Sequence, residues 1–262
     1  MKILVIAPAR TSSTALTFYL STKKGDLLNF NEQVSSSIAD NYNVFEKSNF
    51  FITLYPQIKQ ILQEDLDNIF QTNDKFIIKF TGLHLRGLSN YIDIINPKRF
   101  DEIHLLERHD FLEQCCSNCV ARTEDKWHNN AKNKTVQDFF DQLSKKESYF
   151  NLTTNYIFTT AYDCQQYLLC KKYLQDNGIR YQQHFYEAPV FKFEEIGDLR
   201  KTGLNYSKLI KNYSYFDGTL NNYFAKYFNY QTCQADYTQF VENFSKFNAQ
   251  LTREVLLKSN KK

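Results

Sequence analysis

The first seventeen residues place the tightest constraint on the fold of this 262-residue chain. An apolar run over residues 3–7 is broken by Pro8, and a basic, hydroxyl-rich stretch follows over residues 10–14. Apolar positions then return at helical spacing from Ala15 to Leu20. This order predicts a buried strand, a loop and a helix whose first backbone N–H groups have no partners within the helix. Such a helix start attracts anions, so we expect a phosphate-like group to bind there.

Strand and helix patterns continue to alternate along the chain. That order predicts a three-layer α/β fold, in which helices cover both faces of a parallel sheet. We expect one domain over residues 1–262, with its ligands beyond the carboxyl ends of the strands. Strands are predicted near residues 27–33, 76–80, 103–106 and 181–186, and helices near 58–70, 156–175 and 236–257.

The opening loop, defined as residues 8–14, resembles a loop of the sulfotransferases that use 3′-phosphoadenosine-5′-phosphosulfate (PAPS). In that family a P-[KR]-[ST]-G-[ST]-T-like loop joins the first strand to the first helix and holds the 5′-phosphosulfate. The segment Pro8-Ala9-Arg10-Thr11-Ser12-Ser13-Thr14 matches it at the basic position and at both terminal hydroxyls, with Ser12 where Gly is usual. The resemblance implies a P-loop NTPase-like fold and a cofactor-binding role for Arg10, Thr11, Ser12, Ser13 and Thr14.

A second segment resembles the part of these enzymes that binds the 3′-phosphate of PAPS. Arg108 follows the end of a strand predicted over residues 103–106, and the helix after it carries Ser117. Arg108 and Ser117 resemble the family's Arg and Ser pair, nine positions apart where many members have eight. His109 would satisfy the shorter spacing, so Arg108 and His109 remain alternatives for this role.

The resemblance also implies a set of catalytic residues. Glu32, at the end of a short strand, is similar in position to the base that deprotonates the acceptor hydroxyl. Arg10 would stabilise the leaving 5′-phosphate, and Lys79 or His84, near the end of the third strand, would assist. Arg200 and Lys201 lie in a basic, Gly-containing stretch that resembles the loop closing over the 3′-phosphate and adenine.

Composition excludes several other classes of protein. The net charge is only +3, from 32 basic and 29 acidic residues, so no overall field favours nucleic acid. No apolar stretch reaches the ~20 residues of a membrane span, and no signal peptide is evident, so we expect a cytoplasmic enzyme. Cys116 and Cys119 form a lone C-x-x-C motif, and the five His residues show no metal-ligand spacing. We therefore expect reduced thiols and no metal.

The sequence thus predicts a PAPS-dependent sulfotransferase that releases adenosine 3′,5′-bisphosphate (PAP). Its acceptor would be a small molecule, carbohydrate or lipid with a hydroxyl or amine, and its oligomeric state is left open. Two alternatives share the predicted fold. One is a P-loop nucleotide or small-molecule kinase, against which the missing Walker Lys and glycines count. The other is a non-catalytic nucleotide-binding module.

Overall fold

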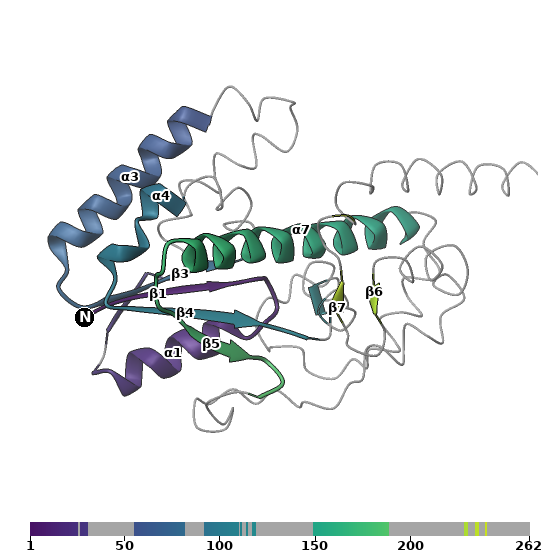
Figure 1. Ribbon diagram of the computed structural model, residues 1–262, viewed down its shortest axis with the longest axis horizontal. Helices are drawn as coiled ribbons and strands as arrows, with labels where there is room; N and C mark the ends of the chain where they lie inside the picture. Colours follow the sequence, from purple (N-terminus) through teal and green to yellow (C-terminus); the bar gives the residue numbers. More distant parts are fainter. Residues whose placement is uncertain are drawn as a thin grey trace, which may run out of the picture. The chain divides into compact units, whose positions relative to one another are not determined.

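The computed structural model describes residues 1–25, 27–30, 55–81, 92–109 and 149–188, together with residues 111, 114, 117, 118, 228, 229, 234, 235 and 239 (Figure 1). The chain divides into two compact units, Met1–Glu107 with Gln166–Asp198, and Arg108–Gln165 with Leu199–Lys262. The expectation of a single domain over residues 1–262 stays a prediction.

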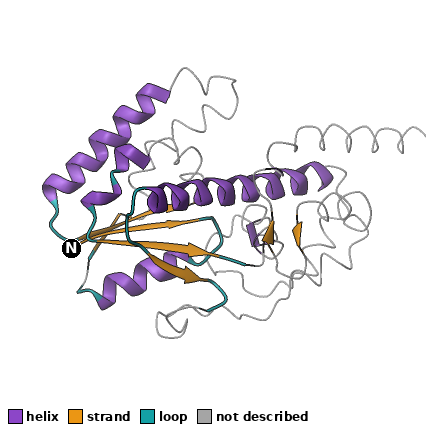
Figure 2. Ribbon diagram, viewed as in Figure 1, coloured by secondary structure: helices purple, strands orange, loops and turns teal. Residues whose placement is uncertain are grey.

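The first unit is built around a parallel sheet. Its five strands lie in the order β2-β3-β1-β4-β5, and every neighbouring pair is parallel (Figure 2). The predicted α/β class with a parallel sheet is therefore confirmed. The strands are β1 (Lys2–Ala7), β2 (Leu28–Phe30), β3 (Phe76–Thr81), β4 (Glu102–Glu107) and β5 (Gln182–Phe185).

Helices precede or follow these strands along the chain. They are α1 (Ser13–Lys23), α3 (Tyr55–Thr72), α4 (Ile92–Ile95), the 3₁₀ turn η4 (Pro97–Arg99) and α7 (Tyr149–Asp176). A short antiparallel pair, β6 (Phe228–Asn229) with β7 (Gln234–Ala235), belongs to the second unit.

Strand β1 is central because both of its faces are apolar. Side chains alternate between the two faces of a strand, so Leu4 and Ile6 point one way and Ile3, Val5 and Ala7 the other. All five are fully buried. Leu4 and Ile6 share a core cluster with residues of α3, α4 and α7, whereas the second set packs against α1. Figure 1 shows α1 on the side of the sheet opposite α3 and α4. The continuous apolar run of the sequence thus became a strand covered on both faces.

Candidate functional site

The opening loop lies directly beyond the central strand and contains an unusual backbone. Arg10 and Ser12 both have positive φ angles, 64° and 66°, in the left-handed region that non-glycine residues adopt infrequently. Thr11, between them, is fully buried, and its Oγ1 donates a hydrogen bond to the carbonyl oxygen of Pro8 at 2.8 Å. A left-handed residue next to a right-handed one turns successive backbone N–H groups toward one side, and loops with this geometry bind anions.

Helix α1 begins within this loop. The first hydrogen bond of the helix runs from the Leu16 N–H to the Ser12 carbonyl at 3.0 Å, so Ser12 occupies the N-cap position. Ser12 and Ser13 are buried, whereas Thr14 is exposed. The Thr17 hydroxyl donates to the Ser13 carbonyl one turn along. The positive end of the helix dipole therefore lies among serine and threonine hydroxyls at the carboxyl end of β1.

Lys79 connects strand β3 to this helix start. It is only 3% exposed, and its Nζ donates a hydrogen bond to Thr14 Oγ1 at 2.9 Å. Lys79 is paired with Val5 in the β1–β3 register and shares the α1 face of the sheet. The structure therefore brings together two residues that sequence reasoning assigned separately, one to catalysis and one to cofactor binding. A buried ammonium at the first turn of α1 adds a positive charge where the helix already favours an anion.

Thr81 is a further polar residue at this edge, which sequence reasoning did not assign a role. It ends β3 and is paired in register with Ala7, the last residue of β1 before the opening loop. Its Oγ1 is buried and has no hydrogen-bond partner among the described residues. A buried hydroxyl in a native structure is normally satisfied, so we expect its partner to be a ligand, a water molecule or a residue outside the described ones. A polar residue at the end of an apolar strand was the signal available in the sequence.

Arg108 and Ser117 belong to the second compact unit and are described separately from the opening loop. Arg108 follows β4 directly and is 7% exposed, and Ser117 is 9% exposed. Near Ser117, Asn118 Nδ2 donates to Thr160 Oγ1 of α7 at 3.0 Å. Burial of both predicted 3′-phosphate ligands shows that neither is an ordinary solvated surface residue. His109 is half-buried, so the alternative between Arg108 and His109 stays open.

Four predicted site residues lie outside the described residues. They are Glu32, His84, Arg200 and Lys201. The predicted helix over residues 236–257 and the C-x-x-C motif are also outside them, apart from single positions.

Within the described part of the chain, no group of three or more His, Cys, Asp or Glu side chains is arranged to hold a metal ion. Cys164 and Cys170 are buried thiols, and burial raises the pKa of Cys170 to about 12. A thiol with this pKa is not a reactive nucleophile. No described helix is both long and apolar enough to cross a membrane.

Fold and site together define a parallel α/β protein with a hydroxyl-rich, cationic loop beyond its central strand. No model of a known protein family matches the chain, and no curated protein is significantly similar to it. The function is therefore inferred from the residues of the site.

Proposed function

We propose that the protein is a sulfotransferase of P-loop NTPase-like fold, which transfers a sulfuryl group from PAPS to an acceptor hydroxyl or amine. The observation that carries this proposal is the contact between Lys79 and Thr14 at the start of α1. It joins a buried cation to a helix N-terminus in the loop that follows the central strand. That combination suits the 5′-phosphosulfate of PAPS, which carries its negative charge on several oxygens.

The donor set of the opening loop fits such a group. Arg10 contributes a planar guanidinium, which forms paired hydrogen bonds with phosphate or sulfate oxygens. Lys79 contributes a compact ammonium, and the loop adds hydroxyl donors and the backbone N–H groups of the first turn. The buried Thr81 hydroxyl lies at the same edge of the sheet. In phosphoryl transfer a metal ion neutralises negative charge on the transferred group. A sulfuryl group carries less negative charge, so side-chain cations and N–H groups are enough to stabilise it.

The reaction we assign is an in-line transfer, to which PAPS supplies the sulfuryl group and a good leaving group. The acceptor oxygen forms a bond to sulfur while the bond from sulfur to the 5′-phosphate oxygen breaks. Glu32 takes the acceptor proton, and Arg10 and Lys79 stabilise the charge that develops on the departing phosphate. Arg108 and Ser117 hold the 3′-phosphate, with Arg200 and Lys201 as further cations around it. His84 is the alternative proton acceptor.

Transfer is tested with PAPS that carries a heavy sulfur isotope in its sulfuryl group. The full-length protein is incubated with this donor and a metabolite extract, and mass spectrometry records labelled sulfate esters and the PAP released. We expect a labelled product and an equal amount of PAP.

Glu32→Gln is the matched variant, because it keeps the shape of the side chain and removes the proton acceptor. A positioned base contributes about 10²–10⁴-fold to rate, so turnover should fall by that factor while PAP affinity is unchanged. Normal turnover of the Glu32→Gln variant would show that Glu32 is an ordinary surface residue and not the base. Magnesium-dependent phosphate transfer from ATP would show a kinase instead, and PAP binding without any transfer would show a binding module.

A further inference from the structure

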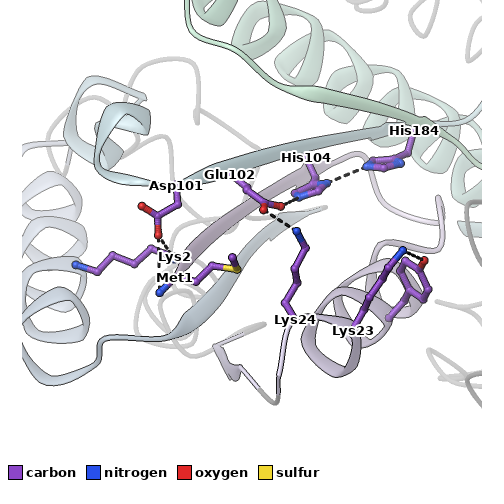
Figure 3. Close-up of polar contacts among 9 residues, drawn as sticks. Met1, Lys2, Lys23, Lys24, Asp101, Glu102, His104 and His184 are labelled. Carbon is purple, nitrogen blue, oxygen red and sulfur yellow. Dashed lines mark hydrogen bonds and ion pairs between the residues drawn. The ribbon is translucent and has the colours of Figure 1, made fainter.

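Two buried histidines join the last two strands of the sheet. His104 in β4 and His184 in β5 are 1% and 8% exposed, and the distance from His104 Nδ1 to His184 Nε2 is 2.9 Å. The ring planes lie within 15° of parallel. Figure 3 shows that the pair continues through Glu102 to Lys24: His104 Nε2 lies 3.1 Å from Glu102 Oε2, and Lys24 Nζ lies 2.7 Å from Glu102 Oε1.

The hydrogen positions in this chain follow from its acceptor end. Partial burial opposes ionisation of Glu102, but hydrogen bonds from Lys24 and His104 outweigh it and lower the pKa of this carboxyl. Glu102 is therefore an acceptor, so His104 Nε2–H donates to it and a neutral His104 has a lone pair on Nδ1. His184 Nε2–H then donates to His104 Nδ1. The remaining nitrogen, His184 Nδ1, is buried and has no hydrogen-bond partner among the described residues.

Both rings are held in the neutral form. Burial lowers the pKa of His104 despite the opposing effect of Glu102, and burial together with repulsion from His104 lowers the pKa of His184 to about 4. Within the described residues, the charged groups that face the pair are Glu102 on β4 and Lys24, directly after α1. One proton more than the neutral pair is tolerable, because a single hydrogen still lies between the two facing nitrogens. A second added proton would disrupt the contact, because His104 Nδ1 and His184 Nε2 would then both carry a hydrogen although they lie only 2.9 Å apart.

The His104–His184 contact bears on the stability of strand β5. Among the strands that the structure describes, β5 is at the edge of the sheet and pairs only with β4. The side-chain contacts of β5 include the His104–His184 bond on the α1 face and a hydrogen bond from Gln183 Nε2 to the Tyr167 hydroxyl at 2.9 Å on the other face. An edge strand of four residues is among the less stable elements of a fold and opens locally.

We propose that the His104–His184 contact is an acid-sensitive latch, which holds strand β5 against β4 while both rings are neutral and releases the strand as the pair takes up protons. This proposal is independent of the sulfotransferase proposal. In the released state His184 regains an ordinary imidazole pKa near 6.5. The released state therefore binds the proton more tightly, and its population rises as the pH falls from about 6.5 to about 4. Between pH 7 and pH 5 the rise from His184 alone is about 20-fold.

Hydrogen exchange of the full-length protein measures this release. Protection factors for a peptide over residues 181–186, corrected for the intrinsic effect of pH on exchange, are compared at pH 7 and pH 5. We expect protection of β5 to fall about 20-fold relative to β1 and β3, which contain no histidine. Equal changes in all three strands, or no change in β5, would overturn the proposal.

A matched variant separates the latch from general acid sensitivity. His184→Gln keeps an N–H donor near the position of Nε2 but does not titrate, so its β5 protection should change by less than about threefold between the two pH values. His109→Gln removes a histidine outside the pair and should keep the 20-fold change. If His184→Gln does not fold, imidazole NMR of the unmodified protein decides: we expect His184 to stay neutral to below pH 5 with Nδ1 deprotonated. An ordinary titration near pH 6.5 would overturn the latch.

Discussion

Lys79 occupies a position in β3 where an apolar side chain would be the usual choice. Its neighbours in the strand, Ile78 and Phe80, are buried, and Lys79 itself is 3% exposed on the α1 face. Burying an ammonium costs free energy, and placing it beside the positive end of α1 adds repulsion. An anion bound at the start of α1 reduces both costs. We therefore interpret Lys79 as a group selected for binding and not for stability.

Lys79→Met tests this interpretation, because it retains the length of the side chain and removes the charge. Replacing a buried charge with an apolar group is often neutral or stabilising, so the free energy of unfolding without ligand should not fall by more than about 1 kcal/mol. PAP affinity should fall about 10- to 100-fold, from the loss of a charged contact of about 1.5–3 kcal/mol. Urea unfolding and titration calorimetry measure the two quantities.

The control for that variant is Lys75→Met, which changes an exposed lysine just before β3. Neither stability nor affinity should change. If Lys79→Met loses more than about 3 kcal/mol of stability and binds PAP normally, the lysine is structural.

Arg108 gives a second prediction at this scale. Arg108→Ala should weaken PAP binding by about 1.5–3 kcal/mol, since it removes a charge-assisted contact to the 3′-phosphate. Adenosine 5′-phosphosulfate, which lacks that phosphate, should bind nearly as before, and the ratio of the two affinities corrects for any general effect on folding. His109→Ala is measured in parallel. If His109→Ala changes the ratio and Arg108→Ala does not, the 3′-phosphate role belongs to His109.

The turn from β1 into α1 explains an irregularity of the sequence. Ser12 stands where the resembled loop usually has Gly, and its φ of 66° lies in the region that Gly adopts without strain. The backbone of the turn is therefore compatible with Gly, although the residue is Ser. The cost of the left-handed conformation for an L-residue is about 1–2 kcal/mol.

Ser12→Gly should consequently stabilise this turn relative to Ser12→Ala. Both variants remove the hydroxyl, and they differ only in Cβ, so their comparison isolates the backbone. Relief of the left-handed strain is partly offset because Gly raises the entropy of the unfolded chain, so we expect the Gly variant to have the higher free energy of unfolding by about 0.5–1 kcal/mol, measured by chemical denaturation. An Ala variant as stable as the Gly variant would mean that residue 12 does not have the left-handed conformation in solution.

The elements themselves were largely predictable where a local pattern defines them. The periodic apolar positions of residues 58–70 lie within α3, Tyr55–Thr72, and the predicted strand over 103–106 lies within β4, Glu102–Glu107. The predicted helix over 156–175 lies within α7, which begins earlier, at Tyr149. Asn151, Thr153, Thr154 and Asn155 hid that start, because Asn and Thr have low helix propensity.

Contacts between elements were not predictable in the same way. Lys79 and Thr14 are 65 positions apart in sequence, and His104 and His184 are 80 apart. Both contacts depend on the strand order β2-β3-β1-β4-β5, which no local pattern determines. The left-handed backbone of Arg10 was also invisible, since sequence propensity favours Gly at such a position.

At the scale of the whole molecule, the account depends on one claim, that the loop beyond the central strand binds the 5′ end of a 3′-phosphorylated adenosine nucleotide. Parallel sheets hold their ligands beyond the carboxyl ends of the strands, where the opening loop follows β1 and Thr81 ends β3. The second compact unit begins with Arg108, to which we assign the 3′-phosphate.

Titration calorimetry of the unmodified protein with PAP and with ADP, each with and without magnesium, tests this claim most directly. We predict that PAP binds without magnesium at least about 10-fold more tightly than ADP, because the 3′-phosphate adds a charge-assisted contact. At a PAP concentration of 100 times Kd, the protein should gain about 2.7 kcal/mol of stability. Equal affinity for PAP and ADP, or binding that requires magnesium, would contradict the account and favour a kinase.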